Sequence, residues 1–222
     1  MAYIIAFISI SILGAIIFFL LISKLSTTLE KLLLAAYSIN LLTEACMMIT
    51  SRLSISNHFI ANIHSLVFGV LMLLILSQIS QRLVKQRATL AILLVGVGFD
   101  CIVWVLDNWV VHSIAVFNPI SQSIIFSVDL IFSIYLLSLI LFIEDTPLRK
   151  NVNSMFVIGF LVYAANNVII DFFFNYYMHL PDQTYIVISE IGIGATIASH
   201  FLVLIGVVWL TRRRKYMLGL FR

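Results

Sequence analysis

The chain has 222 residues, of which 62% are hydrophobic and only 10% are charged, and its mean hydropathy is +1.13. This composition excludes a water-soluble domain, in which about half of the residues are apolar and about a quarter are charged. The formal net charge of +3 comes from basic residues between the apolar runs, so it indicates a membrane topology and no nucleic-acid partner.

Seven apolar runs without Lys or Arg follow one another along the chain. A bilayer core about 30 Å thick requires about 20 apolar residues per helix, so these runs take up most of the sequence. Helices are expected because each backbone polar group in lipid must be paired within its own segment. The predicted spans are 3–22, 32–50, 59–79, 90–111, 124–143, 155–177 and 185–210. We therefore expect an all-α membrane protein, a seven-transmembrane helix bundle that forms one domain over residues 1–222.

The basic residues predict the orientation of the bundle. Twelve of the thirteen lie in the first, third and fifth connections or in the tail, and only Arg52 lies on the other side. Because cytoplasmic loops carry an excess of Lys and Arg, the N-terminus is expected outside and the C-terminus in the cytoplasm. The protein is thus predicted to be a multi-pass protein of the cell inner (plasma) membrane, in contact with the lipid bilayer.

Six acidic residues lie inside the predicted spans, which contain no basic partner for them. A charged group near the bilayer centre costs at least about 2.5 to 3.5 kcal/mol, so such residues normally face the bundle interior or a wet cavity. These acids are Glu44, Asp100, Asp107, Asp129, Asp171 and Glu190.

Several of these polar residues share one predicted depth. Glu44, His64, Asp129, Asp171 and Glu190 are five or six residues from the predicted outer ends of their spans, which is roughly 8 to 9 Å. On the fourth span Asp107 is shallower, and Asp100 lies on the same face about 10 Å deeper. Asn167 and Asp171 are four residues apart, on one side of the sixth span.

This pattern predicts an outward-facing polar pocket that binds a small ligand or cation. Its predicted ligand-binding residues are Glu44, His64, Asp100, Asp107, Asp129, Asn167, Asp171 and Glu190. The alternative is that several acids are protonated and only hydrogen-bond one helix to another. For His200 we predict such a helix-bridging role, and we do not place it in the pocket.

A metal-dependent membrane hydrolase is the second interpretation. Such an enzyme needs about three imidazole or carboxylate ligands and a water molecule, and the candidates for a divalent metal are His64, Asp129, Asp171 and Glu190. The sequence has no HExxH motif, and it lacks the histidine-rich last helix of seven-span zinc hydrolases. No other cofactor is indicated. Retinal is excluded because no lysine lies within a span to form the Schiff base.

A third interpretation is an ion or proton pathway, which would reach the inside through Asp100.

Three segments carry a resemblance to a known group of proteins: LLTEACMMITSRLSISN in the second span, VFNPISQSIIFSVDLIF around the start of the fifth, and MFVIGFLVYAANNVIIDFF in the sixth. The sequence resembles the uncharacterised seven-span integral membrane proteins of Bacteroidetes. In that family an acid often ends the second span, a Phe-Asn pair precedes the fifth, and an aromatic-Tyr-small pattern occurs in the sixth. Glu44, Phe117 with Asn118, and Tyr163 with Ala164 occupy these positions here. The resemblance implies a sensory or signalling accessory role.

We therefore expect a receptor-like or sensory protein whose outer acidic pocket binds a small ligand or cation. Its cytoplasmic loops and tail would pass the bound state to a signalling partner. No nucleotide-binding, nucleophile-elbow or kinase motif is present, so the sequence does not favour an enzyme.

Overall fold

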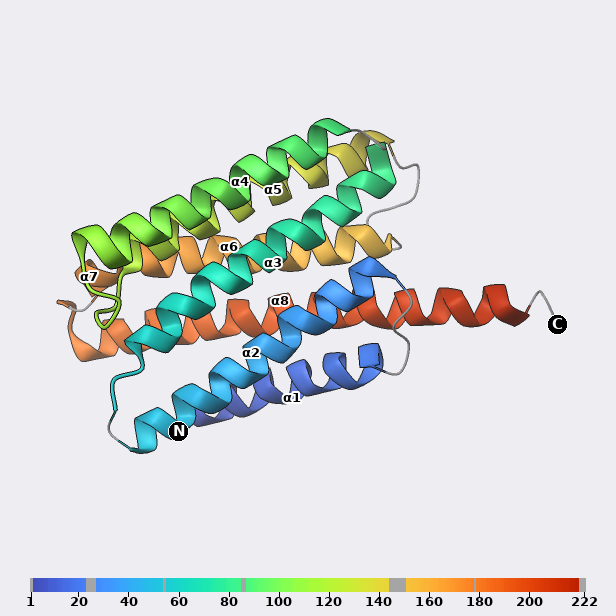
Figure 1. Cartoon of the computed structure of the whole chain (residues 1–222). Coiled ribbons are helices and arrows are strands. Elements are labelled where there is room, and N and C mark those ends of the chain that lie inside the picture. The colour runs from blue at the N-terminus through green and yellow to red at the C-terminus, as the bar shows by residue number, and fades with distance from the viewer. Residues whose placement is uncertain are drawn as a thin grey trace.

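The computed structural model describes residues 2–22, 27–53, 55–84, 87–143, 151–177 and 179–219, and all regular elements within these ranges are helices (Figure 1). The elements are α1 (Ala2–Ile22), α2 (Thr28–Arg52), α3 (His58–Val84), α4 (Arg87–Val105), the π-helix η1 (Leu106–Val111), α5 (Pro119–Ile143), α6 (Val152–Phe172), α7 (Phe174–Tyr177) and α8 (Asp182–Gly219). The prediction of an all-α protein is confirmed.

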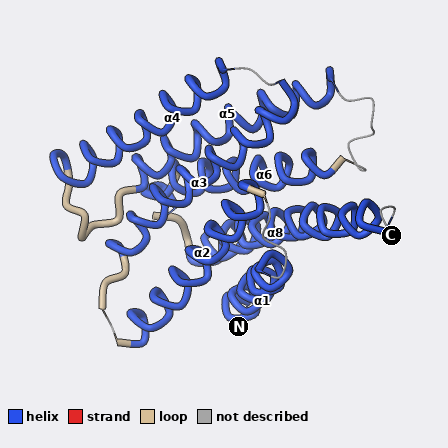
Figure 2. Tube along the Cα trace, turned by 45° about the vertical axis from the view of Figure 1, so that its right-hand side comes forward, coloured by secondary structure: helices blue, strands red, loops and turns tan. Residues whose placement is uncertain are grey.

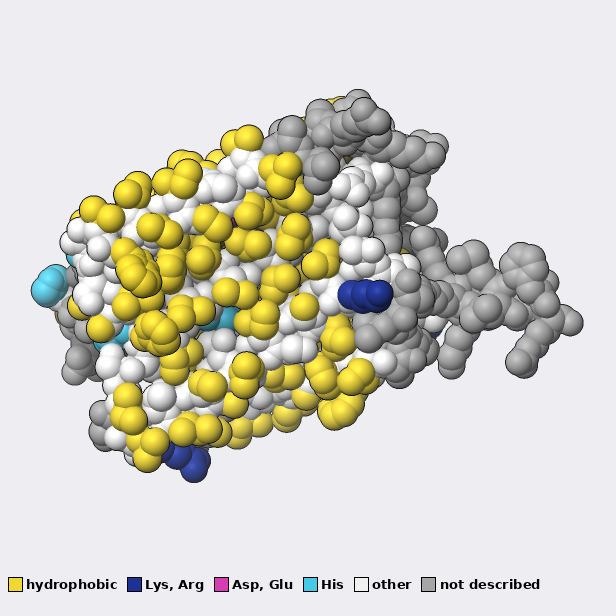
Figure 3. Space-filling model, viewed as in Figure 1, with side chains coloured by type: hydrophobic (Ala, Val, Ile, Leu, Met, Phe, Trp, Pro, Cys, Tyr) yellow, Lys and Arg dark blue, Asp and Glu magenta, His cyan; other side chains and the backbone are white. Residues whose placement is uncertain are grey.

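The long helices have the length and composition of membrane spans. Within the described ranges, six of them qualify: Thr28–Arg52, His58–Gln81, Leu93–Val111, Pro119–Ile143, Val152–Phe172 and Ile186–Arg212. A shorter apolar segment, Ile8–Ile22, lies in α1. Hydrophobic side chains cover much of the long face of the molecule in Figure 3. The protein is therefore a helical, multi-pass membrane-type bundle whose apolar surface suits contact with lipid.

Residues at the helix starts explain why α2 and α5 begin earlier than predicted. The Thr27 hydroxyl accepts a hydrogen bond from the Glu30 amide at 3.3 Å, and the Glu30 carboxylate accepts one from the Thr27 amide at 3.0 Å. This capping box begins α2 four residues before the predicted start. Pro119, whose fixed φ suits a first helical turn, begins α5 five residues before its predicted start. Hydropathy alone misses such turns because they are polar.

Six helices form a closed ring. Around it, α1 packs on α2, α2 on α3, α3 on α5, α5 on α6, α6 on α8, and α8 on α1. Helix α4 lies outside the ring against α3 and α5, as Figure 2 shows. The buried core in the middle includes Tyr37, Phe68, Phe160, Tyr163 and Val203. The ring therefore encloses an interior to which α2, α3, α6 and α8 all contribute side chains.

The connection between η1 and α5 is attached to α3 by one side chain. The Asn62 amide nitrogen donates to the carbonyl oxygens of Ile114 at 3.1 Å and Val116 at 2.6 Å. The Asn62 amide oxygen accepts from the Asn118 backbone at 3.3 Å and from the Gln122 side chain at 3.0 Å. The side-chain nitrogen and oxygen of Asn62 thus both make hydrogen bonds that hold this connection against α3. Through the connection they also hold α4 and α5.

Candidate functional site

The predicted site residues differ widely in burial. Asp100 and Asp129 are completely buried, and Asp171 is 7% exposed. Four others, Glu44, His64, Asp107 and Asn167, are half-buried, whereas Glu190 is exposed. Most of the acids therefore point into the bundle.

The most deeply buried acids form a pair between α4 and α5. Asp129 interacts electrostatically with Asp100, and no hydrogen-bond partner for any of their four carboxyl oxygens is found among the described residues. Gly69 of α3 lies beside the pair: a Cβ there would lie 3.4 Å from Oδ2 of Asp129 and only 2.5 Å from Ile125. A glycine at this position therefore lets α3 approach the acid-bearing face of α5.

Two neighbouring carboxyl groups in a buried site cannot both carry a negative charge without compensation. Burial disfavours each charge, and the two charges would repel each other. Asp100 and Asp129 also lie well inside their helices, away from the connections that carry most of the basic residues.

Tyr163 of α6 lies in the same interior as several of the acids. Its phenol is within electrostatic range of the carboxyl groups of Asp171, Glu44 and Asp129. The tyrosine is buried, and its ring is 5.1 Å from that of Phe68. Tyr163 could not be recognised as a pocket residue from the sequence, because aromatic rings are common in apolar helices.

Glu44 is held on the opposite side of the ring by polar neighbours. Its Oε2 accepts a hydrogen bond from the Ser11 hydroxyl of α1 at 2.8 Å, and its Oε1 accepts one from Asn40 at 3.3 Å. Asn40 and Glu44 are one helical turn apart on α2. Glu44 therefore joins α1 to α2 through Ser11.

The amide and carboxyl groups of α6 do not bond to each other. The Asn167 side chain donates instead to the Tyr163 carbonyl oxygen of the preceding turn, at 2.8 Å. Asp171 keeps one buried oxygen, Oδ2, for which the described part of the chain provides no partner. Asp171 therefore contributes a free acceptor to the interior, whereas the Asn167 amide is already in use.

Asp107 lies at the bundle end rather than beside Asp100. Its Oδ1 is 2.7 Å from Nδ1 of His112, which follows the π-helix. The expectation that both aspartates face one space assumed an α-helix throughout, whereas the backbone is a π-helix from Leu106 onward. An extra residue per turn changes the direction of the side chains that follow.

The exposure of Glu190 and the position of Asp129 along its helix also differ from expectation. Gly192 of α8 packs against Ile170 and Asn166 of α6, whereas Glu190, two residues earlier, is exposed. Asp129 is ten residues, or about 15 Å, beyond the start of α5, because that helix begins at Pro119. Asp129 therefore lies farther from the start of its helix than predicted, and Glu190 does not join the buried acids.

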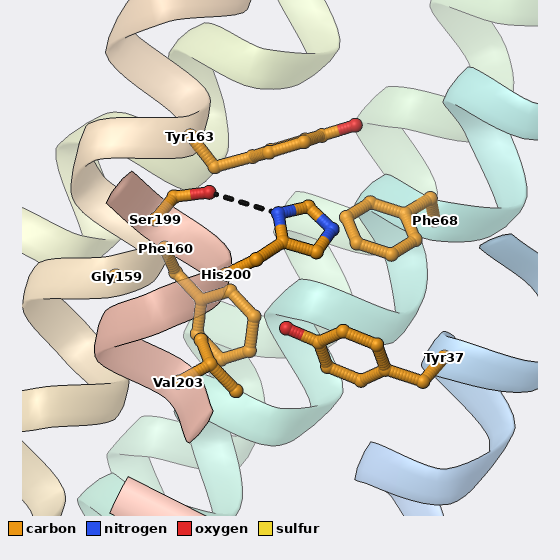
Figure 4. Close-up of a pocket in the computed structure, with 8 residues that line it drawn as sticks. All are labelled: Tyr37, Phe68, Gly159, Phe160, Tyr163, Ser199, His200 and Val203. Atoms are coloured by element: carbon orange, nitrogen blue, oxygen red, sulfur yellow. Dashed lines mark hydrogen bonds between the residues drawn. The ribbon is translucent and has the colours of Figure 1, made fainter. Parts of the chain in front are cut away.

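A small cavity of about 10 Å³ occupies the interior near His200, which the sequence analysis left out of the site. It is lined by Tyr37, Phe68, Gly159, Phe160, Tyr163, Ser199, His200 and Val203 (Figure 4). His200 is 3% exposed, and its hydrogen bonds go to its own helix, to Thr196 and Ser199, rather than to another helix as predicted. The spacing of Gly192, Thr196 and His200 by four residues could have indicated their common inward face.

The candidate metal ligands are dispersed. His64 stacks on Phe68 with ring centroids 5.2 Å apart, and Glu190 is exposed. Among the residues that the structure describes, no group of three or more His, Cys, Asp or Glu is arranged to hold a metal ion. A divalent metal stays a prediction from the sequence.

Comparisons with protein-family models, with curated proteins and with solved structures find no match to this chain. The resemblance to the seven-span proteins of Bacteroidetes stays a prediction as well.

Proposed function

We propose that the protein is a receptor-like or sensory membrane protein that binds a small cation, in the simplest case a proton, between Asp100 and Asp129. The observation that carries the proposal is the buried pair itself, whose four oxygens have no partner in the described ranges. Intramembrane carboxyl groups are costly and commonly mark ion or proton sites. Binding would remove the repulsion within the pair and so change how tightly α4 packs on α5.

We infer further that the N-terminus is outside and that the tail faces the cytoplasm of a bacterial cell, so that the cation enters from the outside. Lys31 lies in the first turn of α2 and Arg52 in its last, and Arg212 is near the end of α8. Most of the basic residues of the sequence lie in the connections and tail that are predicted to share a side with Lys31, so the positive-inside rule supports this orientation. The basic end of α8 would then be available to a cytoplasmic signalling partner.

A pH-jump experiment on the full chain in lipid vesicles tests the receptor-like function. Tryptophan emission reports the bundle, because Trp104 lies one turn from Asp100 and donates to Asn62 on α3 at 2.7 Å. We expect a reversible emission change that is lost in the Asp100→Asn/Asp129→Asn double variant and kept in Glu190→Gln. No change in the natural chain, or an unaltered change in the double variant, would contradict the proposal.

A proton pathway is the second candidate, favoured by further unpartnered polar atoms along the helices. Ser133, one turn beyond Asp129 on α5, and Ser154, near the start of α6, both have buried hydroxyl oxygens without a partner in the described ranges. Together with Asp171 they extend the polar interior toward both ends of the bundle.

Vesicles loaded with a pH-sensitive dye separate the two candidates. A pathway predicts proton flux that falls in Asp129→Asn and in Ser133→Ala, whereas a receptor predicts no flux above that of protein-free vesicles. Flux that is unchanged in both variants would rule out this route.

A further inference from the structure

The imidazole of His200 presents one nitrogen as an unused hydrogen-bond acceptor. Its Nδ1 lies 2.9 Å from the Thr196 carbonyl oxygen, which can only accept, so Nδ1 must carry a proton. The nearby Ser199 hydroxyl already donates to the same carbonyl at 2.8 Å. In the neutral ring Nε2 then has a free lone pair. That nitrogen is buried, and no described residue donates to it.

The cavity beside this ring is near the smallest size that holds one water molecule. Its volume is about 10 Å³, and His200 and Tyr37 both line it. The two rings meet edge to face, with centroids 5.6 Å apart and planes at 87°. In Figure 4 the Tyr37 hydroxyl points toward the space between His200 and Phe160. A donor and an acceptor thus border one small space.

The two polar groups come from helices that are not neighbours in the ring. Tyr37 belongs to α2 and His200 to α8, and α1 lies between these helices, packed on both. A molecule bound between the two side chains would therefore connect α2 to α8 through the interior.

We propose that this cavity is a specific water site, in which one water molecule donates a hydrogen bond to Nε2 of His200 and accepts one from the Tyr37 hydroxyl. A buried acceptor without a partner is costly, and a buried water with two or more polar partners removes that cost. The site goes beyond the proposed function and does not depend on it, because no acid lines the cavity.

Solid-state NMR on the full chain in lipid vesicles, with ¹⁵N-labelled histidine, tests the site. We expect His200, assigned by its absence in His200→Gln, to have a protonated Nδ1 and an unprotonated Nε2 that receives magnetisation from water. This transfer should be lost in Tyr37→Phe, which keeps the ring. It should persist in the control Tyr135→Phe, whose tyrosine is exposed on α5.

Three results would overturn the proposal: a proton on Nε2 instead of Nδ1, no transfer from water to Nε2 in the natural chain, or transfer that is unchanged in Tyr37→Phe. The signals of the other histidines report whether each variant is folded. Asp129→Asn should leave the transfer intact, so failure of the cation site and failure of the water site can be distinguished.

Discussion

Gly69 is the residue that lets the acid pair and its surrounding helices come together. It lies on α3, and the nearest atoms to a Cβ placed there would be Ile125 Cγ2 and Asp129 Oδ2 of α5. Because the closer of these is part of a branched, buried side chain, a methyl group could be accommodated only by moving α3 away from α5.

We predict that Gly69→Ala destabilises the bundle by about 1 to 3 kcal/mol, as other overpacked cores are destabilised. Gly98→Ala is the matched control, since no atom lies within 4 Å of a Cβ at Gly98 of α4. In a helix interior that control should be neutral or stabilising by up to about 1 kcal/mol. Thermal unfolding in detergent measures both, and equal behaviour of the two variants would contradict the proposed packing.

The acids show what the sequence can and cannot predict about single residues. The inward position of Asp100, Asp129 and Asp171 was predictable, because carboxyl groups are too costly to face lipid. The exposure of Glu190 was not predictable from hydropathy, because hydrophobic residues occur on all sides of α8 and do not show which side faces the interior. The inward face of His200 could have been inferred from its four-residue spacing with Thr196 and Gly192, but the cavity beside it could not, because that cavity also depends on Tyr37 of α2.

At the scale of the elements, the positions of the spans follow from hydropathy, whereas their ends depend on specific polar groups. The apolar runs locate every long helix, because each must pair its backbone internally in lipid. The early start of α5 depends on Pro119, and the end of α4 on a π-helix that no hydropathy pattern signals. The start of α5 sets how far along its helix Asp129 lies, and the π-helix sets the direction in which Asp107 points.

The η1–α5 connection provides a test at this scale. Asn62→Ala removes a side chain with four hydrogen bonds to Ile114, Val116, Asn118 and Gln122. The loss of these hydrogen bonds leaves part-buried backbone groups of the connection unpaired, so we expect the connection to open locally. Hydrogen exchange followed by mass spectrometry should show faster exchange over residues 112–118.

Ser138→Ala is the control for that experiment, because its serine on α5 is exposed and bonds only to the Ile134 carbonyl of its own helix. It should leave the exchange of the connection unchanged. Equal protection in Asn62→Ala and in the natural chain would show that Asn62 does not hold the connection.

At the scale of the whole molecule, a ring of six helices with α4 outside places the acid pair where the outer helix meets the ring. Asp100 therefore belongs to the helix outside the ring, and Asp129 to a helix of the ring. A cation held between them would act on the contact through which α4 packs against the ring.

The proposed orientation is testable through single cysteines in a chain in which Cys46 and Cys101 are replaced by alanine. Lys31 and Ser51 are exposed and lie at opposite ends of α2. In right-side-out vesicles a membrane-impermeant maleimide should label Ser51→Cys but reach Lys31→Cys only after the vesicles are opened. The reverse order would place the N-terminus in the cytoplasm.

The central claim is that Asp100 and Asp129 hold a proton or another small cation between them inside the bundle. Infrared difference spectroscopy of the full chain in lipid, recorded while pH or sodium concentration is changed, observes these carboxyl groups directly. We predict a carboxyl band that responds to the change and disappears in Asp129→Asn, but persists in Glu190→Gln. A spectrum in which Asp129→Asn is identical to the natural chain would contradict the claim.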